Sequence, residues 1–379
     1  MTDAGYMRLA LEEAWKGCGH VNPNPMVGCV IVKDGEIIGR GFHEAYGGLH
    51  AERNALRSCI RSPQGATVYV TLEPCCHYGK TPPCTDALIE NRVARVVFGS
   101  ADPNPLVRGK SAGILQAAGI QTEGGVLQNE CDKLNEAFFF FITRRRPFII
   151  LKYAMTADGK TATATGKSRW ITGEKARQRV HFDRHRHAAV LAGVGTVLAD
   201  NPMLTCRFAK TAGDAYPDTG ALSQPVRIVC DTNLRTPLDS ALVQSARDVP
   251  LILATAVRNP EAAKPYRDKG CGILPLDKTG NGVDLHALSE ELGKRNIVSV
   301  IVEGGPTIAW SFLQAGLVNK VQVYLAPKIF GGKGKSAVEG SGIDLPSQAF
   351  RLSGTEITAY GEDFLLEGEA VPPDARNPD

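Results

Sequence analysis

The chain has 379 residues, of which 43 are basic and 40 acidic, a net charge of +3 and 43% apolar residues. This length exceeds that of one ordinary domain, so we expect two hydrophobic cores. The balanced charge, the lack of an export signal and the lack of any apolar run of about 18 residues argue against a nucleic-acid-coating or membrane-spanning protein. The ten cysteines are scattered, which favours a soluble enzyme of the reducing cytoplasm.

The first 146 residues predict a layered α/β domain. A helix with apolar residues at helical spacing spans Tyr6 to Ala14, and strands at 27–32 and 36–40 flank Asp34-Gly35, a strong hairpin signal. Helices at 51–59, 85–91 and 111–118 then alternate with strands at 67–72 and 93–99. Four consecutive phenylalanines at 138–141 are interpreted as a buried helix end, followed by a basic exit at the domain junction.

The sequence His50-Ala51-Glu52, followed by Pro74-Cys75 and Cys84, has the ligand order of zinc-dependent deaminases. One imidazole and two thiolates leave the fourth tetrahedral position of Zn²⁺ open for water, as in catalytic sites. Glu52 is placed to move protons between that water, a ring nitrogen and the departing amine. The pattern therefore predicts hydrolytic deamination, with His50, Cys75 and Cys84 as metal ligands and Glu52 as the general acid/base.

The two cysteines enclose residues 76–83, a longer loop than the Cys-x-x-Cys spacing usual in deaminases. A loop held by the metal at both ends would bring His77 and Lys80 within reach of an anionic substrate. The alternative is a closed structural zinc site with Cys76 or His77 as the fourth ligand. Such a site would have no use for Glu52.

The second half begins after Pro147 with an apolar strand at 148–154 that carries Lys152. Gly193 to Leu198 follows another apolar strand but lacks the third glycine of a Rossmann fingerprint. In Val300 to Thr307 a buried strand turns through two glycines into a helix with proline near its start. This segment predicts a phosphate cradle or, alternatively, a tight turn without a ligand.

Two histidines, His181 and His185, lie one helical turn apart, but Phe182 stands where the zincin motif requires glutamate. We therefore expect a solvated helix face there rather than a second metal site. Residues 369–379 are polar and contain proline, which predicts a flexible tail. The expected domains are 1–146 and 147–368, followed by this tail.

Together these motifs resemble the bifunctional riboflavin-biosynthesis deaminase-reductases of bacteria over nearly the whole chain. The resemblance rests on 22–28 (NPNPMVG), 50–52 (HAE), 71–75 (TLEPC) and 80–84 (KTPPC), and in the second half on 168–173 (SRWITG), 193–207 and 302–307. It implies an α/β fold class, with an N-terminal cytidine-deaminase-like three-layer domain and a C-terminal dihydrofolate-reductase-like domain.

The resemblance implies two reactions. The first domain, with Zn²⁺, would remove the 2-amino group of 2,5-diamino-6-(5-phosphoribosylamino)pyrimidin-4-one, and the second would reduce the ribose to a ribityl chain with NADPH. The expected partner is this small-molecule substrate, with no nucleic acid and no membrane, and we expect a homo-oligomer. The rival function is an RNA base deaminase whose C-terminal half binds without chemistry.

The resemblance also implies a role for individual residues. In the deaminase half the pyrimidine would contact Asn24, Asp102 and Asn104, and the ribose phosphate would contact His43, His77 and Lys80. In the reductase half the substrate would contact Lys152, Ser168, Arg184, Asp200, Leu204, Arg207 and Glu303, with Arg184 and Arg207 as phosphate partners. The cofactor would contact Ala154, Trp170, Thr196, Asp200, Thr232, Gly305, Pro306, Thr307, Ile308, Ala309, Trp310 and Ser311. Lys152 is the candidate proton donor, and a purely electrostatic contact is its alternative role.

Overall fold

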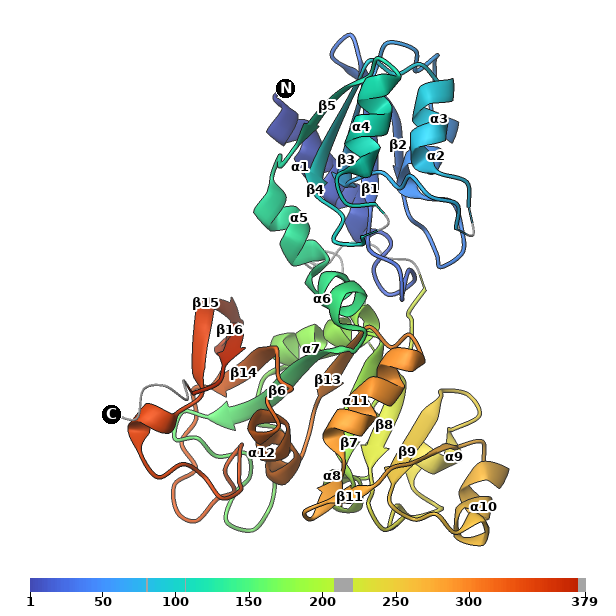
Figure 1. Ribbon diagram of the computed structural model, residues 1–379. Coiled ribbons are helices and arrows are strands. Elements are labelled where there is room, and N and C mark those ends of the chain that lie inside the picture. Colours follow the sequence, from blue (N-terminus) through green and yellow to red (C-terminus); the bar gives the residue numbers. More distant parts are fainter. Residues whose placement is uncertain (80, 106, 208–220, 374–379) are drawn as a thin grey trace. The chain divides into compact units, whose positions relative to one another are not determined.

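The computed structural model describes residues 1–79, 81–105, 107–207 and 221–373 (Figure 1). These residues divide into two compact units. The N-terminal unit comprises 1–145 and, beyond it, 221–223, and the C-terminal unit comprises 146–207 and 224–373. Within the described ranges, no helix has the length and apolar character needed to cross a membrane.

The N-terminal unit is built on a five-stranded sheet in the order β2-β1-β3-β4-β5. Its first two strands form an antiparallel hairpin that turns at Asp34 and Gly35, whose φ angles of 53° and 79° suit the tight turn that the sequence predicts. The remaining strands are parallel to one another. The strands are β1 (Gly28–Lys33), β2 (Glu36–Phe42), β3 (Thr67–Leu72), β4 (Arg95–Ser100) and β5 (Gln121–Gly124).

Helices cover both faces of this sheet, which gives three layers (Figure 1). Alternate residues of β1 point to opposite faces, so Val30 packs with Met7 of α1 whereas Ile31 packs with Ala55 of α2. The helices are α1 (Asp3–Trp15), α2 (Ala51–Arg57), α3 (Cys84–Glu90), α4 (Lys110–Ala117), α5 (Gln128–Leu134) and α6 (Glu136–Arg144). The elements predicted from the sequence are present here, with ends that differ by a few residues.

Two glycines of β2 bring α2 unusually close to the sheet. A Cβ atom on Gly41 would lie 2.3 Å from the backbone nitrogen of Ala55 and 2.7 Å from the carbonyl oxygen of Ala51. A Cβ atom on Gly39 would lie 2.5 Å from the carbonyl oxygen of Ala55. Only glycine permits this approach, which fixes the first turn of α2 and hence the residue before it, His50.

The phenylalanine run lies in α6, as expected, but it is not a fully buried helix end. Phe141 is buried, whereas Phe138, Phe139 and Phe140 are only half-buried. Phe138 and Ile142 instead line a pocket of the N-terminal unit. The reason is that residues i and i+4 share one helix face, so this face can cover a cavity while Phe141 points elsewhere.

The C-terminal unit is built on a nine-stranded sheet in the order β10-β9-β8-β7-β13-β6-β14-β16-β15. The strands from β10 to β14 are parallel, and β16 and β15 add an antiparallel edge. The strands are β6 (Phe148–Thr156), β7 (Ala189–Gly193), β8 (Val226–Cys230), β9 (Leu251–Thr255), β10 (Gly272–Pro275), β13 (Ser299–Val302), β14 (Lys320–Ala326), β15 (Arg351–Tyr360) and β16 (Asp363–Val371), with β11 (Lys278–Thr279) and β12 (Gly282–Val283) as a separate pair. Because β16 continues to Val371, the segment expected to be a tail from residue 369 begins inside a strand; residues 374–379 lie outside the described residues.

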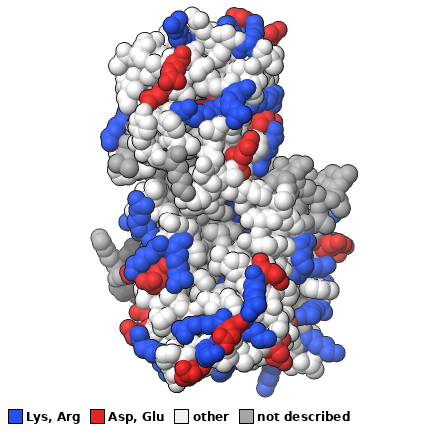
Figure 2. Space-filling view, turned by 90° about the vertical axis from the view of Figure 1, so that its right-hand side faces the viewer, with Lys and Arg blue, Asp and Glu red and all other residues white. Residues whose placement is uncertain are grey.

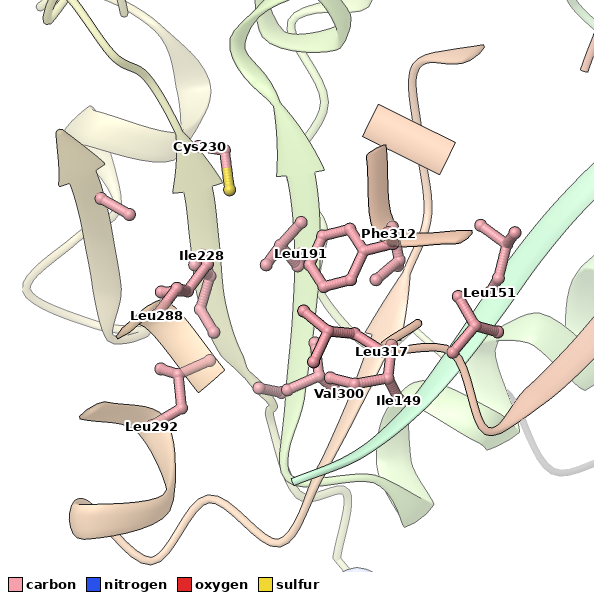
Figure 3. Packing of buried hydrophobic residues seen from close by; sticks show 14 of the residues in the cluster. Ile149, Leu151, Leu191, Ile228, Cys230, Leu288, Leu292, Val300, Phe312 and Leu317 are labelled. Carbon is pink, nitrogen blue, oxygen red and sulfur yellow. The ribbon is translucent and has the colours of Figure 1, made fainter. Parts of the chain in front are cut away.

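Helices pack on this sheet around two main clusters of apolar side chains. In the larger cluster, Leu191 lies beside Phe312 of α12, and Ile228 lies beside Leu288 of α11 (Figure 3). The second cluster joins Val190 and its neighbours to α8, α9 and α10. The helices are α7 (Glu174–Arg186), α8 (Val194–Asp200), α9 (Ala241–Gln244), α10 (Pro260–Asp268), α11 (Leu285–Lys294) and α12 (Pro306–Gln314), with a short 3₁₀ turn η1 (Pro346–Gln348).

The expected solvated face of α7 is wrong. His185 is 1% exposed and Asp183 is 2% exposed, because this part of α7 packs against the sheet. Asp183 accepts a hydrogen bond from the Nε of Arg179 at 2.9 Å and lies 3.4 Å from the hydroxyl of Tyr324 in β14. The polar residues of α7 therefore form buried ion pairs and hydrogen bonds, which a hydropathy pattern cannot distinguish from a wet surface.

Candidate active sites

The predicted metal ligands converge at the starts of two helices in the N-terminal unit. His50 immediately precedes α2, Cys84 is the first residue of α3, and Cys75 follows β3. The Nδ1 atom of His50 lies 3.4 Å from both Sγ atoms, and the ligand atoms of all three residues lie within 4.8 Å of one another. No other group of this kind is found among the described residues.

This donor set fits zinc with one open coordination position. One imidazole nitrogen and two sulfurs are ligands that Zn²⁺ prefers, and three protein ligands are typical of catalytic sites. Cys76 and His77 are not part of the cluster, so the structure does not support the closed four-ligand alternative. Hydrogen bonds from Cys84 and His50 lower the pKa of Cys75 to about 4, so one thiolate is already favoured before any metal is considered.

Glu52 lies in the first turn of α2 and faces the same pocket as His50 and Cys75. Its side chain is buried, and burial, together with the nearby charge of Cys75, raises the pKa of its carboxyl group. A carboxyl group with a raised pKa can both take up and release a proton near neutral pH. The position and the chemistry of Glu52 therefore suit a general acid/base.

The pocket has a volume of about 320 Å³. It brings together the expected pyrimidine contacts Asn24, Asp102 and Asn104, and the expected phosphate contacts His43 and His77. Lys80 lies outside the described residues. The Nδ1 atom of His77 is buried and has no hydrogen-bond partner, which leaves it for a ligand. Sequence reasoning did not find the apolar wall formed by Phe138 and Ile142, because residues so distant from the motifs carry no local signal.

Glu73 has a structural role that the sequence motif did not reveal. Its buried carboxylate accepts hydrogen bonds from the backbone N–H groups of Asp102 and Gly109, each at 3.2 Å, and from the hydroxyl group of Ser111. Asp102 in turn accepts the N–H of Asn104 at 2.8 Å. Burial and the neighbouring Glu73 raise the pKa of Asp102 to about 6. Glu73 thus holds the loop that carries two of the expected substrate contacts.

In the C-terminal unit, Glu303 follows β13 and lies between two cations. Its Oε1 and Oε2 atoms accept hydrogen bonds from Nε and Nη2 of Arg184 at 2.6 and 2.8 Å, and Oε2 lies 3.7 Å from Nζ of Lys152. The side chains of Glu303, Arg184 and Lys152 are only 5%, 12% and 16% exposed. Burial alone would raise the pKa of Glu303, but Arg184 and Lys152 lower it to about 2.

The guanidinium group of Arg184 makes three hydrogen bonds within the protein, which leave two of its five N–H groups for the expected phosphate contact. Besides its two bonds to Glu303, its Nη1 donates to the carbonyl oxygen of Thr205 at 3.0 Å. Arg207 is the exposed cation of this site, with its Nη1 donating to the hydroxyl of Thr205 at 2.8 Å. The backbone N–H of Arg207 donates to Nδ1 of His181, whose pKa is lowered to about 4 by burial and by the two arginines.

The other expected substrate and cofactor residues occupy several connections of the C-terminal unit. Thr196 in α8 packs against the glycines that follow β13, since a Cβ atom on Gly304 would lie 2.9 Å from its hydroxyl oxygen. Ser168 is half-buried, Leu204 is buried with φ of +49°, and Trp170 is 64% exposed over Arg177. Ala154 lies in β6, Asp200 ends α8, and Thr232 follows β8.

The helix after the double glycine begins at Pro306, as predicted, and Gly305 has φ of +81°. The residues of this expected cofactor segment differ in how exposed they are. Ala309 is 4% exposed and belongs to the apolar core, and Trp310 packs against Gly340 and Phe350. Their side chains are thus engaged within the protein, and their expected cofactor contacts stay predictions. Gly305, Pro306, Thr307 and Ile308 lie at that start, whereas the hydroxyl of Ser311 donates to the carbonyl oxygen of Thr307.

Comparisons with known proteins match each half of the chain to a family. Residues 1–100 match the cytidine and deoxycytidylate deaminase zinc-binding region, and residues 147–366 match the RibD C-terminal domain. The riboflavin biosynthesis protein RibD of Actinobacillus pleuropneumoniae is 48% identical over 374 residues, which cover 98% of this chain and 96% of that protein. The chain belongs to the RibD family.

Other members of the RibD family match over the same length. RibD of Escherichia coli is 41% identical over 97% of this chain and 99% of its own. The solved RibD of Acinetobacter baumannii (form 1) has a TM-score of 0.86 at 36% identity, covering 97% of this chain and 99% of its own. A Thermotoga maritima structure, described as a diaminohydroxyphosphoribosylaminopyrimidine deaminase/5-amino-6-(5-phosphoribosylamino)uracil reductase, has a TM-score of 0.82 at 37% identity over 97% of this chain and 99% of its own.

Membership of the RibD family confirms the fold class and the general activity predicted from the sequence. A RibD protein combines a zinc-dependent deaminase with an NADPH-dependent reductase in riboflavin biosynthesis. The N-terminal unit is the cytidine-deaminase-like part, and the C-terminal unit is the RibD reductase part. The RNA base deaminase considered as a rival is not favoured, because the match to the RibD C-terminal domain assigns that half to a reductase.

Proposed function

We propose that this RibD chain removes the 2-amino group of 2,5-diamino-6-(5-phosphoribosylamino)pyrimidin-4-one as ammonia and then reduces the ribose of the product to a ribityl chain with NADPH. The observation that carries the proposal is the clustering of His50, Cys75 and Cys84 beside a pocket that Glu52 lines. The name of the Thermotoga maritima relative supports this choice of substrates. We further propose that residues 1–146 and 147–368 form the two catalytic domains.

In the deaminase domain, His50, Cys75 and Cys84 would hold the zinc ion. Zinc bound there supplies Lewis acidity that makes a water molecule more acidic. The carboxylate of Glu52 would take one proton from the attacking water and deliver it to a ring nitrogen. It would then take the second proton from the hydroxyl group that has added to the ring carbon and give it to the departing amine, so that the carbonyl forms as ammonia leaves. Asn24, Asp102 and Asn104 orient the pyrimidine, and His77 and Lys80 bind the ribose phosphate. The unpartnered Nδ1 of His77 supports the last assignment.

In the reductase domain, the cofactor supplies the hydride and the protein orients the two reactants. Gly305 to Ile308, with Thr196, would hold NADPH at the start of α12, and Ala154, Trp170, Asp200 and Thr232 would complete that surface. Lys152, Ser168, Leu204 and Glu303 would line the ribose, with Arg207 on the phosphate. Lys152 either donates the proton or acts as a purely electrostatic contact, and burial lowers its pKa, which suits a donor.

We also propose a homo-oligomer in the cytoplasm, with no nucleic-acid or membrane partner. None of the ten cysteines, all of which are described, forms a disulfide, which suits a reducing compartment. Acidic and basic side chains are interspersed on the face shown in Figure 2, without the concentrated basic field of a nucleic-acid-binding protein. The edge strand β15 exposes most of its residues, including Ile357 at 70%, which supports association of copies. Light scattering of the purified protein tests this part.

Incubation of the purified protein with the diaminopyrimidine nucleotide, with and without NADPH, tests the main proposal by mass analysis of the products. Ammonia release is expected in both cases, and the ribityl product only with NADPH. Glu52→Gln should lower deamination by roughly 10² to 10⁴. Arg207→Ala should cripple reduction and leave ammonia release intact. An unchanged deamination rate in Glu52→Gln would refute the assigned chemistry.

A further inference from the structure

His43 lies just after β2 and is 3% exposed, although it faces the deaminase pocket. Both of its ring nitrogens have partners. Nδ1 lies 2.9 Å from the carbonyl oxygen of Leu49, and Nε2 lies 3.0 Å from Nδ2 of Asn24. The His43 ring also contacts the ring of His50 edge to face, with 5.4 Å between the centroids. The orientation of the His43 ring is therefore fixed by contacts at both nitrogens and at the ring itself.

These contacts determine which atoms carry hydrogen. A carbonyl oxygen can only accept, so Nδ1 of His43 must donate to Leu49. The amide nitrogen Nδ2 of Asn24 can only donate, so Nε2 of His43 accepts from it. The amide of Asn24 cannot flip without losing this bond. Its carbonyl oxygen is consequently held as the acceptor that Asn24 offers to a ligand.

We infer that His43 is a positioning residue that acts through Asn24 and does not bind the ribose phosphate. It fixes the Asn24 amide so that its oxygen accepts a hydrogen bond from an N–H or amino group on the pyrimidine edge. A buried imidazole that donates through Nδ1 to Leu49 and accepts through Nε2 from Asn24 has no N–H group left for a phosphate oxygen. The inference rests on the proposed function of this pocket and names the substrate feature that it reads, a hydrogen-bond donor.

Two substitutions at position 43 separate the two bonds of the ring. Asparagine places its amide at the position of Nδ1, so His43→Asn can keep the Leu49 contact but cannot reach Asn24. Glutamine places its amide oxygen at the position of Nε2, so His43→Gln can still accept from Asn24. His43→Asn should raise KM for the pyrimidine nucleotide about fivefold to tenfold, the effect of one lost hydrogen bond, with little change in kcat. His43→Gln should stay within about twofold of the wild type.

A double-mutant cycle with Asn24→Ala tests the route of action. If His43 acts through Asn24, His43→Asn adds nothing in the Asn24→Ala background. The same KM ratio is expected with the dephosphorylated riboside, because phosphate is not involved. Zinc content, measured by elemental analysis, should be equal in all variants. A purely structural role would instead lower zinc content and add to the effect of Asn24→Ala.

Three results would overturn the inference while leaving the proposed deaminase intact: additive effects in the cycle, equal KM values for the two position-43 variants, or a penalty that disappears with the riboside. The last would make His43 a phosphate ligand after all. If His43→Asn does not fold, the comparison of His43→Gln with Asn24→Ala on both substrates decides, since only the second should raise KM. If the wild-type protein releases no ammonia from the nucleotide, the proposed function fails and the inference with it.

Discussion

Replacement of Glu303 by glutamine should destabilise the reductase domain as well as abolish reduction. Glu303→Gln keeps the shape of the side chain but leaves Arg184 and Lys152 as buried cations without a counter-charge. Breaking a buried pair in this way costs about 3–5 kcal/mol. The pKa of Glu303 gives a similar figure, since its fall from 4.5 to about 2 corresponds to about 3 kcal/mol at about 1.4 kcal/mol per pH unit.

For a domain of this size, a loss of about 3 kcal/mol should lower the melting temperature of the reductase transition by roughly 6–12 °C. The melting temperature is measured by calorimetry of the whole chain at pH 7.5. A separate assay of ammonia release shows that the deaminase domain of the same variant is intact. Asp277→Asn is the matched control, because Asp277 and Arg258 form an ion pair whose side chains are 83% and 62% exposed, and such pairs contribute little.

The pH dependence of this effect has a defined sign. Because the folded-state pKa of Glu303 is depressed, its contribution is fully present above pH 4.5 and is lost as the pH falls toward about 2. The difference between wild type and Glu303→Gln should therefore be constant from pH 5 to pH 8. A Glu303→Gln protein that melts within 2 °C of the wild type would refute the reasoning that the buried cations depend on this carboxylate.

Three further predictions follow from the contacts described above. Glu73→Gln should raise KM for the deaminase substrate severalfold, because one amide oxygen cannot accept all three hydrogen bonds that Asp102, Gly109 and Ser111 donate to Glu73. Steady-state kinetics measures this effect, with the exposed Glu90→Gln as the control. Equal KM values for the two variants would show that the assignment of Glu73 is wrong. Since the folded-state pKa of His181 is lowered to about 4, the protein should lose stability as the pH falls from 6.5 to about 4. In His181→Asn the midpoint of urea unfolding should therefore depend less on pH over that range. If the midpoints of the variant and the wild type fall in parallel with pH, the prediction is wrong. Removal of zinc by a chelator should stop ammonia release and lower the melting temperature of the deaminase domain only. Oxidation of NADPH with the deaminated intermediate should continue. A loss of both activities would contradict the independence of the two domains.

Sequence reasoning succeeded where local chemistry determines the structure. Asp34-Gly35 encodes its own turn, and His50 and Cys84 were recognised because each stands at the start of a helix in a motif of fixed order. The double glycine before Pro306 likewise predicts the strand-to-helix turn that the structure contains. These features depend on residues that are neighbours in the chain, so a single sequence carries them.

It failed where distant segments decide the surroundings of a side chain. The polar face of α7 suggested solvent, but His185 and Asp183 are buried by strands more than a hundred residues away. The ion pair between Arg184 and Glu303 was also not found, because the two residues lie more than a hundred positions apart in the chain. The roles of Glu73 and Phe138 were missed for the same reason, since both arise from tertiary packing.

The close contact between β2 and α2 restricts which residues can occupy the strand next to the metal centre. Gly39 and Gly41 do not line the pocket, yet they set how closely the helix that begins after His50 approaches the sheet. Substitution of either glycine is therefore limited by the space between β2 and α2, independently of the chemistry of the site. A transfer of the His-Ala-Glu triplet to another scaffold must therefore include glycines at these two strand positions. Larger side chains there would push the helix away from the sheet and move the imidazole away from the two sulfur atoms.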